Sequence, residues 1–378
     1  MHTLPAESIA LSPSPSDPSP PRSYLFVEFL RDDVVHFEVS GVRAAPPASA
    51  VQNGMYTTQM IDEAAVWPGP SRPVVQTNST GGIVSFATAQ MRVDIDCGTL
   101  AATVYDTTQA PPLLLTRYSY GNLGGAIKTL NMAQSFAQNI YGLGEHYMEP
   151  FGSADGDFFG KAFMLSPDVP FGNAAWPLTV DGAWKGMSEL AYFPIMYVAG
   201  PGTQNYATFF DNVHRKEWVF TADPWALNMW GTHVRWYTIR GASLPALRTT
   251  YMSLVGRPLV PPKRYFGLHQ SIFGYRSWDH ANVDIDLLTA PAVAAQRFPV
   301  DAIVFDIYWF GGKFYGDQSE QAARASVMGS LQWDPVAFPD PVRNVAALRY
   351  AENVRKCQKS SRRVGFWENA IFLFSVPG

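Results

Sequence analysis

Two pairs of aspartates, each separated by a single residue, resemble the carboxylate pairs that bind divalent cations. Asp155 and Asp157 lie in the segment SADGDFF, and Asp284 and Asp286 lie in NVDIDLL. The glycine between the first two favours a turn that their side chains stabilise. The second pair opens a helical stretch, where carboxylates interact favourably with the amino-terminal end of a helix. Both pairs are therefore interpreted as structural rather than as metal sites.

The other short motifs exclude several classes of enzyme. GxGxxG, Walker A, HExxH and GxSxG patterns do not occur, so a nucleotide-binding, zinc-protease or serine-hydrolase site has no support. His146 and His269 lie in otherwise apolar segments, which favours structural roles over metal binding. Asn78 begins a glycosylation sequon, which is meaningful only if the chain is secreted.

Charge and cysteine content exclude further classes. The chain has 28 basic and 32 acidic residues, a net charge of −4, and no run rich in Lys or Arg. Nothing therefore attracts a polyanion, and nucleic acid is not an expected partner. The two cysteines, Cys97 and Cys357, cannot build a disulfide-dense scaffold or a cysteine-based zinc site.

The sequence predicts no membrane span. The best apolar candidate, Leu190–Gly200, is short and interrupted by Pro194, whereas a span needs about 18 or more apolar residues. The first residues lack the basic and apolar regions of a signal peptide, although a misplaced start codon would hide one. The chain is expected to be soluble, and its compartment and oligomeric state are left open.

Aromatic residues are abundant: 11 Trp, 17 Tyr and 24 Phe make up 14% of the chain. Aromatic rings pack in large hydrophobic cores and also stack on sugar rings. Core packing is the first interpretation of this surplus, and carbohydrate binding is the alternative.

The larger part of the sequence is typical of strands. A leader rich in Ser and Pro, residues 1–21, is expected to be disordered. Beyond it, short apolar runs alternate with turn residues and predict an all-β sandwich of unusual size up to about residue 250, in a domain of residues 22–262. The clearest runs are YLFVEFL, VVHFEV, GIVSFAT, MRVDID, AATVYD, PLLLTRYSYG, LAYFPIMYVAG, YATFFDN, KEWVFTAD and VRWYTIRG.

One of these runs shows the strand period clearly. In MRVDID, the apolar residues Met91, Val93 and Ile95 alternate with polar ones. Successive side chains of a strand point to opposite faces, so these three share one face. The run predicts a half-buried strand.

The pattern changes after RPLVPPKR, a connector punctuated by prolines. Strand and helical runs then alternate, which is typical of βα units on a parallel sheet. The helical stretches are about Asp279–Arg297 and Val342–Cys357, and the buried strand is Val300–Ile307. We predict an α/β domain over residues 263–348, followed by a tail of unclear origin at 349–378.

Five longer segments then occur in a fixed order: YGLGEHY; YFPIMYVAG with YATFFDN; VRWYTIRG with YMSLVGRPLVPPKRYFGLHQSIFGY; FPVDAIVFDIYWFG; and LQWDPVAFPDP. Together they resemble glycoside hydrolase family 31, the family of α-glucosidases and α-xylosidases. The resemblance extends over Tyr24 to Leu348. The YWFG and LQWD segments are most similar to the branch that holds bacterial α-glucosidases and α-1,4-transglucosylases.

The resemblance implies a multidomain β plus α/β protein, with a large amino-terminal β-sandwich followed by the first βα units of an incomplete (β/α)8 TIM barrel. It also implies a retaining mechanism on α-linked glucosyl oligosaccharides or polysaccharides, which are hydrolysed or transferred to another sugar. Both reactions need only carboxylates and positioned hydrogen-bond partners, so no metal or organic cofactor is expected.

Five residues are expected from this resemblance to bind substrate. Reacting groups of such barrels lie at the carboxyl ends of the strands, and Asp306 follows the apolar run DAIVF. The resemblance assigns Asp306 to sugar hydroxyls at the cleavage subsite, with Ile307 beside it, while Trp309 either forms an apolar wall or is buried under the barrel rim. Phe273 corresponds to an aromatic residue of the first strand, and Asp168 to an acidic residue on a sandwich loop. The alternatives are a turn residue for Asp168 and a helix cap or turn residue for Asp306.

No catalytic pair is found in the matching segments. A retaining glycosidase needs two carboxyl groups about 5 to 5.5 Å apart, and in this family both lie beyond the third barrel strand. From Lys263 onward the sequence supplies fewer than half of the about 250 residues of a full barrel, and after Leu348 the resemblance decays. We therefore expect no catalytic residue, no activity of the chain itself, and an uncovered sheet edge that lowers solubility or requires a partner.

Three hypotheses follow. The first is the amino-terminal part of a family 31 α-glucosidase or α-transglucosylase. The second is a non-catalytic carbohydrate-binding or regulatory protein derived from such an enzyme, which holds sugar on exposed aromatic residues of the sandwich. The third, a β-sandwich adhesion module with chance similarity, is disfavoured by five segments in the same order.

Overall fold

The computed structural model divides into two compact units, Met1–Arg257 and Pro258–Gly378, which are described in turn. The structure describes residues 24–40, 60–61, 67–78, 81–123, 127–144, 146–148, 157–160, 162–165, 177–180, 183–188, 193–212, 214, 216–231, 234–267, 269–272, 278, 302–305, 309, 332–344 and 346.

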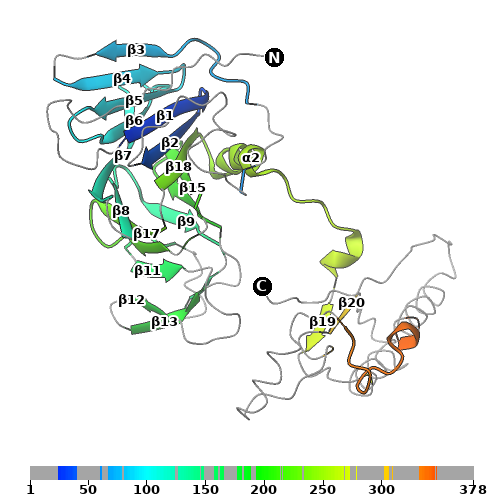
Figure 1. The fold of residues 1–378 in the computed structure, drawn as a ribbon. Helices are drawn as coiled ribbons and strands as arrows, with labels where there is room; N and C mark the ends of the chain where they lie inside the picture. Colours follow the sequence, from blue (N-terminus) through cyan, green and yellow to red (C-terminus); the bar gives the residue numbers. More distant parts are fainter. Residues whose placement is uncertain are drawn as a thin grey trace. The chain divides into compact units, whose positions relative to one another are not determined.

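Six strands of the first unit form one antiparallel sheet, in the order β1-β2-β18-β15-β14-β9 (Figure 1). Although β2 and β18 come from opposite ends of the unit, they pair along their length, with Phe37 opposite Trp236. The strands are β1 (Tyr24–Arg31), β2 (Val34–Ser40), β18 (Val234–Gly241), β15 (Asn205–Phe210), β14 (Ile195–Ala199) and β9 (Asn139–Gly142).

A second antiparallel sheet has nine strands, in the order β11-β16-β17-β8-β7-β6-β5-β4-β3. In β5 the side chains of Met91, Val93 and Ile95 are buried and those between them are half-buried, which confirms the predicted period of two. The strands are β11 (Ala162–Leu165), β16 (Lys216–Val219), β17 (Trp225–Trp230), β8 (Ile127–Met132), β7 (Leu113–Asn122), β6 (Ala102–Asp106), β5 (Met91–Asp96), β4 (Ile83–Ala87) and β3 (Val75–Asn78).

A smaller antiparallel sheet completes the strands of the first unit. It has the order β10-β13-β12, with β10 (His146–Met148), β13 (Ala183–Ser188) and β12 (Pro177–Val180). Each of the ten runs that the sequence analysis names as strand-like overlaps a strand of the structure. The strand-rich character of this region is therefore confirmed.

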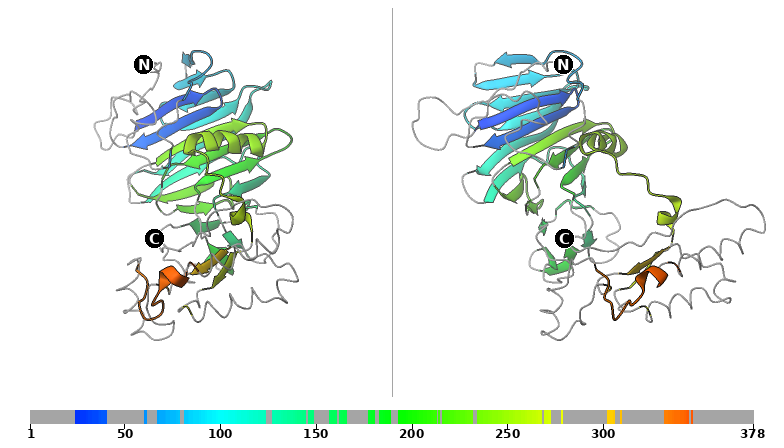
Figure 2. Two further views of the ribbon diagram at one scale, coloured as in Figure 1. Left: turned by 90° about the vertical axis from the view of Figure 1, so that its right-hand side faces the viewer. Right: turned by 45° about the vertical axis from the view of Figure 1, so that its right-hand side comes forward.

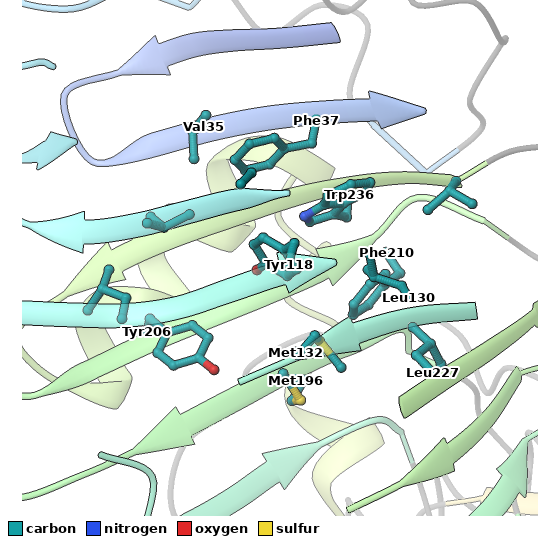
Figure 3. Close-up of a cluster of buried hydrophobic side chains, with 14 of the residues drawn as sticks. Val35, Phe37, Tyr118, Leu130, Met132, Met196, Tyr206, Phe210, Leu227 and Trp236 are labelled. Carbon is teal, nitrogen blue, oxygen red and sulfur yellow. The ribbon is translucent and has the colours of Figure 1, made fainter. Parts of the chain in front are cut away.

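The two large sheets bury a common core between them (Figure 3). Phe37 and Trp236 of the six-stranded sheet stack with their ring centroids 5.1 Å apart. Tyr118 of the nine-stranded sheet packs against both rings, at 5.6 and 5.2 Å. Burial of such large apolar surfaces is the main favourable term in folding.

Many of the aromatic side chains that the structure describes lie in this core. Trp218, Trp225 and Trp236 are wholly buried. Among the aromatic side chains whose exposure the structure describes, Phe193 and Phe266 are the exposed ones. The first interpretation of the aromatic content, core packing, is therefore confirmed for the described residues.

Polar groups also connect the two sheets. The Tyr118 hydroxyl lies 2.9 Å from Thr208 Oγ1 and 2.7 Å from Thr238 Oγ1, which both belong to the six-stranded sheet. Burial raises the pKa of Tyr118 to about 12, so the phenol stays protonated and can donate a hydrogen bond. At the end of β6, Asp106 accepts a 2.8 Å hydrogen bond from Nε of Arg240 in β18.

Helix α2 (Leu244–Val255) packs against the other face of the six-stranded sheet (Figure 2). The prediction of strands alone up to about residue 250 is wrong here. The Ser243 side chain caps the helix, a proline stands in its first turn, and the buried residues Leu247, Tyr251 and Leu254 recur at spacings of four and three. This is the helical period, and the cap and proline are ordinary signals of a helix start.

Because of α2, strand β15 is buried on both faces. Phe209 contacts Tyr251 of the helix, with ring centroids 5.2 Å apart. Its neighbour Phe210 points the other way and contacts Trp218 of the nine-stranded sheet at 5.3 Å. All six residues of β15 are buried, so the strand holds three layers together.

The second unit contains a 3₁₀ turn, η1 (Lys263–Phe266), and two strands, β19 (His269–Ile272) and β20 (Ala302–Phe305). Residues 341–344 are helical, and 342–344 lie within the stretch that the sequence predicts as a second helix. The predicted helix at Asp279–Arg297 lies outside the described residues. None of the helices in the described parts of either unit is long and apolar enough to cross a membrane.

Candidate substrate-binding site

The parallel pair β19 and β20 provides the frame of the candidate site. It is the one parallel pair among the strands that the structure describes, and its register runs from His269 opposite Ala302 to Ile272 opposite Phe305. The last residues of the two strands, Ile272 and Phe305, are opposite each other, so the carboxyl ends of the strands lie side by side. This arrangement confirms the predicted parallel pairing, and such an edge is where barrel enzymes place their functional groups.

The predicted substrate-binding residues follow these strands in the sequence. Phe273 comes directly after β19, and Asp306 and Ile307 come directly after β20. These three residues and Asp168 lie outside the described residues, so their roles stay predictions. The structure places the strand ends from which the first three continue.

Trp309 is the one predicted site residue that the structure describes. Its side chain is 3% exposed, and its ring packs against Trp333 with centroids 5.2 Å apart. Of the two interpretations offered for Trp309, an open wall or a buried residue, the geometry favours the buried one. Its contact with substrate stays a prediction.

A tight turn at residues 332–338 packs against this tryptophan. Asp334 Oδ1 accepts hydrogen bonds from the backbone N–H groups of Val336 (2.8 Å) and Ala337 (3.0 Å). The Phe338 N–H donates to the Asp334 carbonyl at 2.8 Å. An aspartate that accepts from the next N–H groups, followed by proline, is a common way to build a turn. We call residues 332–338 the aspartate turn.

The aspartate turn contacts the segments that follow both parallel strands. The Asp334 N–H donates to the Trp309 carbonyl at 2.9 Å, and the Trp278 N–H donates to the Ala337 carbonyl at 3.0 Å. Trp333 of the turn also contacts the Phe305 ring, at 5.9 Å between centroids. The sequence analysis used LQWDPVAFPDP only as part of a resemblance and assigned Asp334 no role. The Asp-Pro pair in that segment was the available signal.

One of the four aspartates that resemble a metal site is described. Asp157 Oδ1 accepts from the N–H groups of Ile140 (2.7 Å) and Phe159 (3.0 Å), and Oδ2 accepts from the Asn139 side chain at 2.7 Å. These bonds anchor the 157–160 segment to β9, which supports the structural interpretation of Asp157. The other three aspartates, Asp155 among them, lie outside the described residues.

The histidines and the sequon give no additional site. The His269 ring packs edge-on against Tyr265, with centroids 6.0 Å apart, which agrees with a structural role. His146 and Asn78 lie in β10 and β3, and the residues that complete the sequon fall outside the described part. No group of three or more His, Cys, Asp or Glu gathers as a metal site among the residues that the structure describes.

A buried ion network lies on the six-stranded sheet. Arg235 Nε is 3.2 Å from Glu38 Oε1 and 3.1 Å from Asp211 Oδ2, and both the Arg235 and Glu38 side chains are 1% exposed. Arg235 also donates to the Tyr237 hydroxyl at 2.6 Å. Because water does not reach these groups, a dissolved sugar cannot reach them either. The network is therefore structural.

The backbone geometry at the end of β9 requires the first glycine of the YGLGEHY segment. Gly142 ends β9 with a positive φ of 102°, and a Cβ atom there would collide with the Ile195 carbonyl of β14. The next N–H, that of Leu143, donates to the same carbonyl at 2.8 Å. Only glycine allows the two strands to approach so closely.

Residues 258–363 match the family model described as the glycosyl hydrolases family 31 TIM-barrel domain. The resemblance to glycoside hydrolase family 31 is confirmed. The family 31 match begins at Pro258, the first residue of the second unit, and contains β19, β20 and the aspartate turn.

Solved structures, two family 31 enzymes among them, share the fold over most of this chain. A dextranase from Flavobacterium johnsoniae complexed with glucose has a TM-score of 0.62 and 18% identity, covering 87% of this chain and 35% of its own. An α-xylosidase from a soil metagenome complexed with xylose has 0.57 and 15%, covering 87% and 43%. The cycloalternan-forming enzyme from Listeria monocytogenes has 0.57 and 12%, covering 92% and 30%. The chain thus spans less than half the length of each of these enzymes.

Proposed function

We propose that this chain is the amino-terminal, substrate-binding part of a retaining family 31 α-glycosidase that hydrolyses or transfers α-linked glucosyl units. Its proposed architecture is a large β-sandwich at residues 22–262, after a leader at 1–21, and the first βα units of a (β/α)8 barrel at 263–348. A divergent tail follows at residues 349–378.

The observation that carries this proposal is the parallel pair β19 and β20, whose carboxyl ends lie side by side at Ile272 and Phe305. Phe273 and Asp306 continue from these ends. A carboxylate at such an edge accepts hydrogen bonds from sugar hydroxyls, and an aromatic ring gives the sugar an apolar face. We assign Ile307 and Trp309 to the same subsite. Asp168 of the first unit is proposed separately as a substrate-binding residue.

The proposed substrate class is an α-linked oligosaccharide or polysaccharide. Glucose and xylose occupy the family 31 dextranase and α-xylosidase structures named above, so both sugars are compared in the test. Retaining hydrolysis needs a nucleophile and an acid/base carboxyl group. We propose that neither is among the five residues assigned here, and that no metal or organic cofactor takes part.

The test is titration calorimetry of the chain with maltose, glucose and xylose. We expect Asp306→Ala to weaken binding of the preferred sugar about 10- to 100-fold, because a hydrogen bond to a charged group is worth about 1.5 to 3 kcal/mol. Asp340→Ala is the matched control. Asp340 caps the turn of helix at residues 341–344 through the Arg343 N–H, at 3.0 Å, and its loss should leave sugar affinity unchanged.

Hydrolysis of p-nitrophenyl α-glucoside by the same chain separates binding from catalysis. We expect no turnover in the wild type or in Asp306→Ala. Turnover that Asp306→Ala abolishes would show that the chain holds its own catalytic carboxylates. Equal sugar affinity of wild type and Asp306→Ala would remove the subsite assignment.

Binding of sugar on the sandwich surface is less favoured. That hypothesis needs exposed aromatic platforms, and among the described aromatic side chains of the first unit Phe193 alone is exposed. A single phenyl ring gives little orientation to a sugar, which polar groups must also position.

A further inference from the structure

The aspartate turn holds both ends of the short stretch that contains Asp306. Residues 306–308 lie between Phe305, the last residue of β20, and Trp309. The Phe305 ring packs against Trp333 and Phe338, at 5.9 and 5.6 Å between centroids. Trp309 is held by the Asp334 N–H at 2.9 Å and by the Trp333 ring at 5.2 Å.

The same turn holds the segment after β19. Phe273 begins the stretch 273–277, which ends at Trp278. The Trp278 N–H donates to the Ala337 carbonyl at 3.0 Å. One turn thus forms contacts with residues that border both Phe273 and Asp306, which come from different strands.

The orientation of these contacts depends on one side chain. Asp334 Oδ1 accepts from the N–H groups of Val336 and Ala337, and so fixes the two peptides that precede the Ala337 carbonyl. The peptide that carries this carbonyl donates through the Phe338 N–H to the Asp334 carbonyl. The backbone N–H of Asp334 points at the Trp309 carbonyl. Loss of the carboxylate removes the two acceptor bonds that close the turn between the Asp334 N–H, which donates to Trp309, and the Ala337 carbonyl, which accepts from Trp278.

We propose that Asp334 is a positioning residue of the substrate site, which acts through the aspartate turn and sets the relative place of the two segments that carry Phe273 and Asp306. This inference rests on the proposed function for its consequence in sugar binding. The claim that Asp334 positions these two segments concerns the second unit alone, and hydrogen exchange tests it without any sugar.

Asp340 supplies a control of the same chemistry only six residues away in the same segment. Its Oδ1 accepts from the Arg343 N–H at 3.0 Å, and its carbonyl accepts from the Asn344 N–H at 3.0 Å. Both bonds stabilise the following helical turn. Asp340→Ala therefore tests whether the loss of any aspartate that caps a turn has the effect that we assign to Asp334.

The experiment is hydrogen exchange of the full chain with mass-spectrometric detection, for wild type, Asp334→Ala, Asp334→Asn and Asp340→Ala. In Asp334→Ala we expect exchange to rise by about tenfold or more in peptides covering 273–278 and 306–309 as well as in the turn itself. Asp334→Asn keeps an oxygen acceptor and should restore wild-type exchange. Asp340→Ala should change residues 341–346 only, and unchanged exchange over residues 24–255 reports an intact first unit.

Calorimetry with the preferred sugar adds the functional measurement. We expect Asp334→Ala to weaken affinity by about tenfold and Asp334→Asn and Asp340→Ala to leave it unchanged. Faster exchange confined to residues 334–338, or the same spread of faster exchange in Asp340→Ala, overturns the positioning role. A wild type that binds no sugar contradicts the proposed function, whereas the exchange pattern still decides whether Asp334 positions the two segments.

Discussion

Lys216 shows how a single buried cation affects this protein. Its side chain is wholly buried at the start of β16 and donates to the carbonyls of Asn212 and His214, the latter at 3.0 Å. Burial lowers the pKa of Lys216 to about 7, against an opposing effect of Asp211, because the charged ammonium loses its hydration. The group therefore releases its proton in the folded chain several pH units earlier than in the unfolded chain.

This shift predicts a pH dependence of stability. Above about pH 7 the folded chain has lost the proton, while the unfolded chain keeps it up to its ordinary pKa of 10.5. The unfolded state then binds more protons, so the contribution of Lys216 to the free energy of unfolding rises with pH, by at most about 1.4 kcal/mol per unit. Below pH 7 both states are charged and the contribution is constant.

The measurement compares urea unfolding of wild type and Lys216→Met between about pH 7 and pH 9. We expect the difference in unfolding free energy to change in favour of the wild type as pH rises. Lys128→Met is the control, because Lys128 is only part-buried and donates to the Gly231 carbonyl at 3.0 Å. A difference that is constant over this range would contradict the lowered pKa of Lys216.

At the scale of elements, the two large sheets are joined by a polar contact at Arg240. Its guanidinium donates to Asp106 Oδ2 at 2.8 Å, to Thr108 Oγ1 at 2.8 Å and to Gln90 Oε1 at 3.2 Å. The Asp106 side chain is 3% exposed, and Arg240 is its cationic partner. An arginine side chain that donates to three acceptors fixes the end of β18 in one sheet against the end of β6 in the other.

We expect Arg240→Met to lower the free energy of unfolding by about 3 kcal/mol, because it leaves the Asp106 carboxylate buried without a cation. Arg92→Met is the matched control. The Arg92 pair with Asp94 lies within a single strand and is part-exposed, so its loss should cost less than about 1 kcal/mol. If urea unfolding showed the same loss of unfolding free energy in both variants, the Arg240 contact between the sheets would stabilise the protein no more than the Arg92 pair does.

Helix α2 gives a second prediction at this scale. Leu247 is wholly buried between the helix and the six-stranded sheet, so Leu247→Ala should cost about 2 to 5 kcal/mol through lost burial and a cavity. Thr249→Ala, on the exposed side of the helix, should stay within about 0.5 kcal/mol. Native-state hydrogen exchange of the amides in β15 and β18 measures the effect, and similar exchange in both variants would contradict the packing role of α2.

Sequence patterns predicted some elements and missed others for physical reasons. Strands with one buried face, such as β5, carry a period of two that the sequence shows directly. Helix α2 was missed because its twelve residues follow a long series of strands, although Ser243 and the spacing of Leu247, Tyr251 and Leu254 are helical signals. The parallel pairing of β19 with β20 was predicted from the alternation of strand and helical runs.

The candidate site was only partly predictable. Asp306 and Phe273 were assigned from a resemblance, and the structure adds the strand ends that precede them. The role of Asp334 was not predictable from its own neighbours. The hydrogen bond of Asp334 to Trp309 and its effect on Ala337 link segments that are distant in the sequence. A local sequence pattern does not indicate which distant carbonyl accepts a hydrogen bond from a given N–H.

At the scale of the whole molecule, the chain is two compact units whose division coincides with the start of the family 31 match. The first unit contains the large core and its charged network. The second contains the parallel pair and the aspartate turn. Tests of stability therefore report mainly on the first unit, and tests of the proposed sugar subsite around Asp306 mainly on the second.

The double burial of β15 has a consequence for how the layers find their alignment. In most strands the alternation of apolar and polar residues decides which face turns inward, and a slip by one residue is opposed at every position. The apolar residues of β15 give no such discrimination, because Phe209 and Phe210 both find apolar surroundings.

Alignment must then be set by polar groups that have unique partners: Thr208 within the strand, 2.9 Å from the Tyr118 hydroxyl, and one residue at each end. The Asn205 amide donates to the Ala242 carbonyl at 3.1 Å, and just beyond the other end Asp211 pairs with Arg235. An inserted residue between Asn205 and Asp211 would leave the apolar side chains of the strand in apolar surroundings. One of these two polar residues would nevertheless lose its partner.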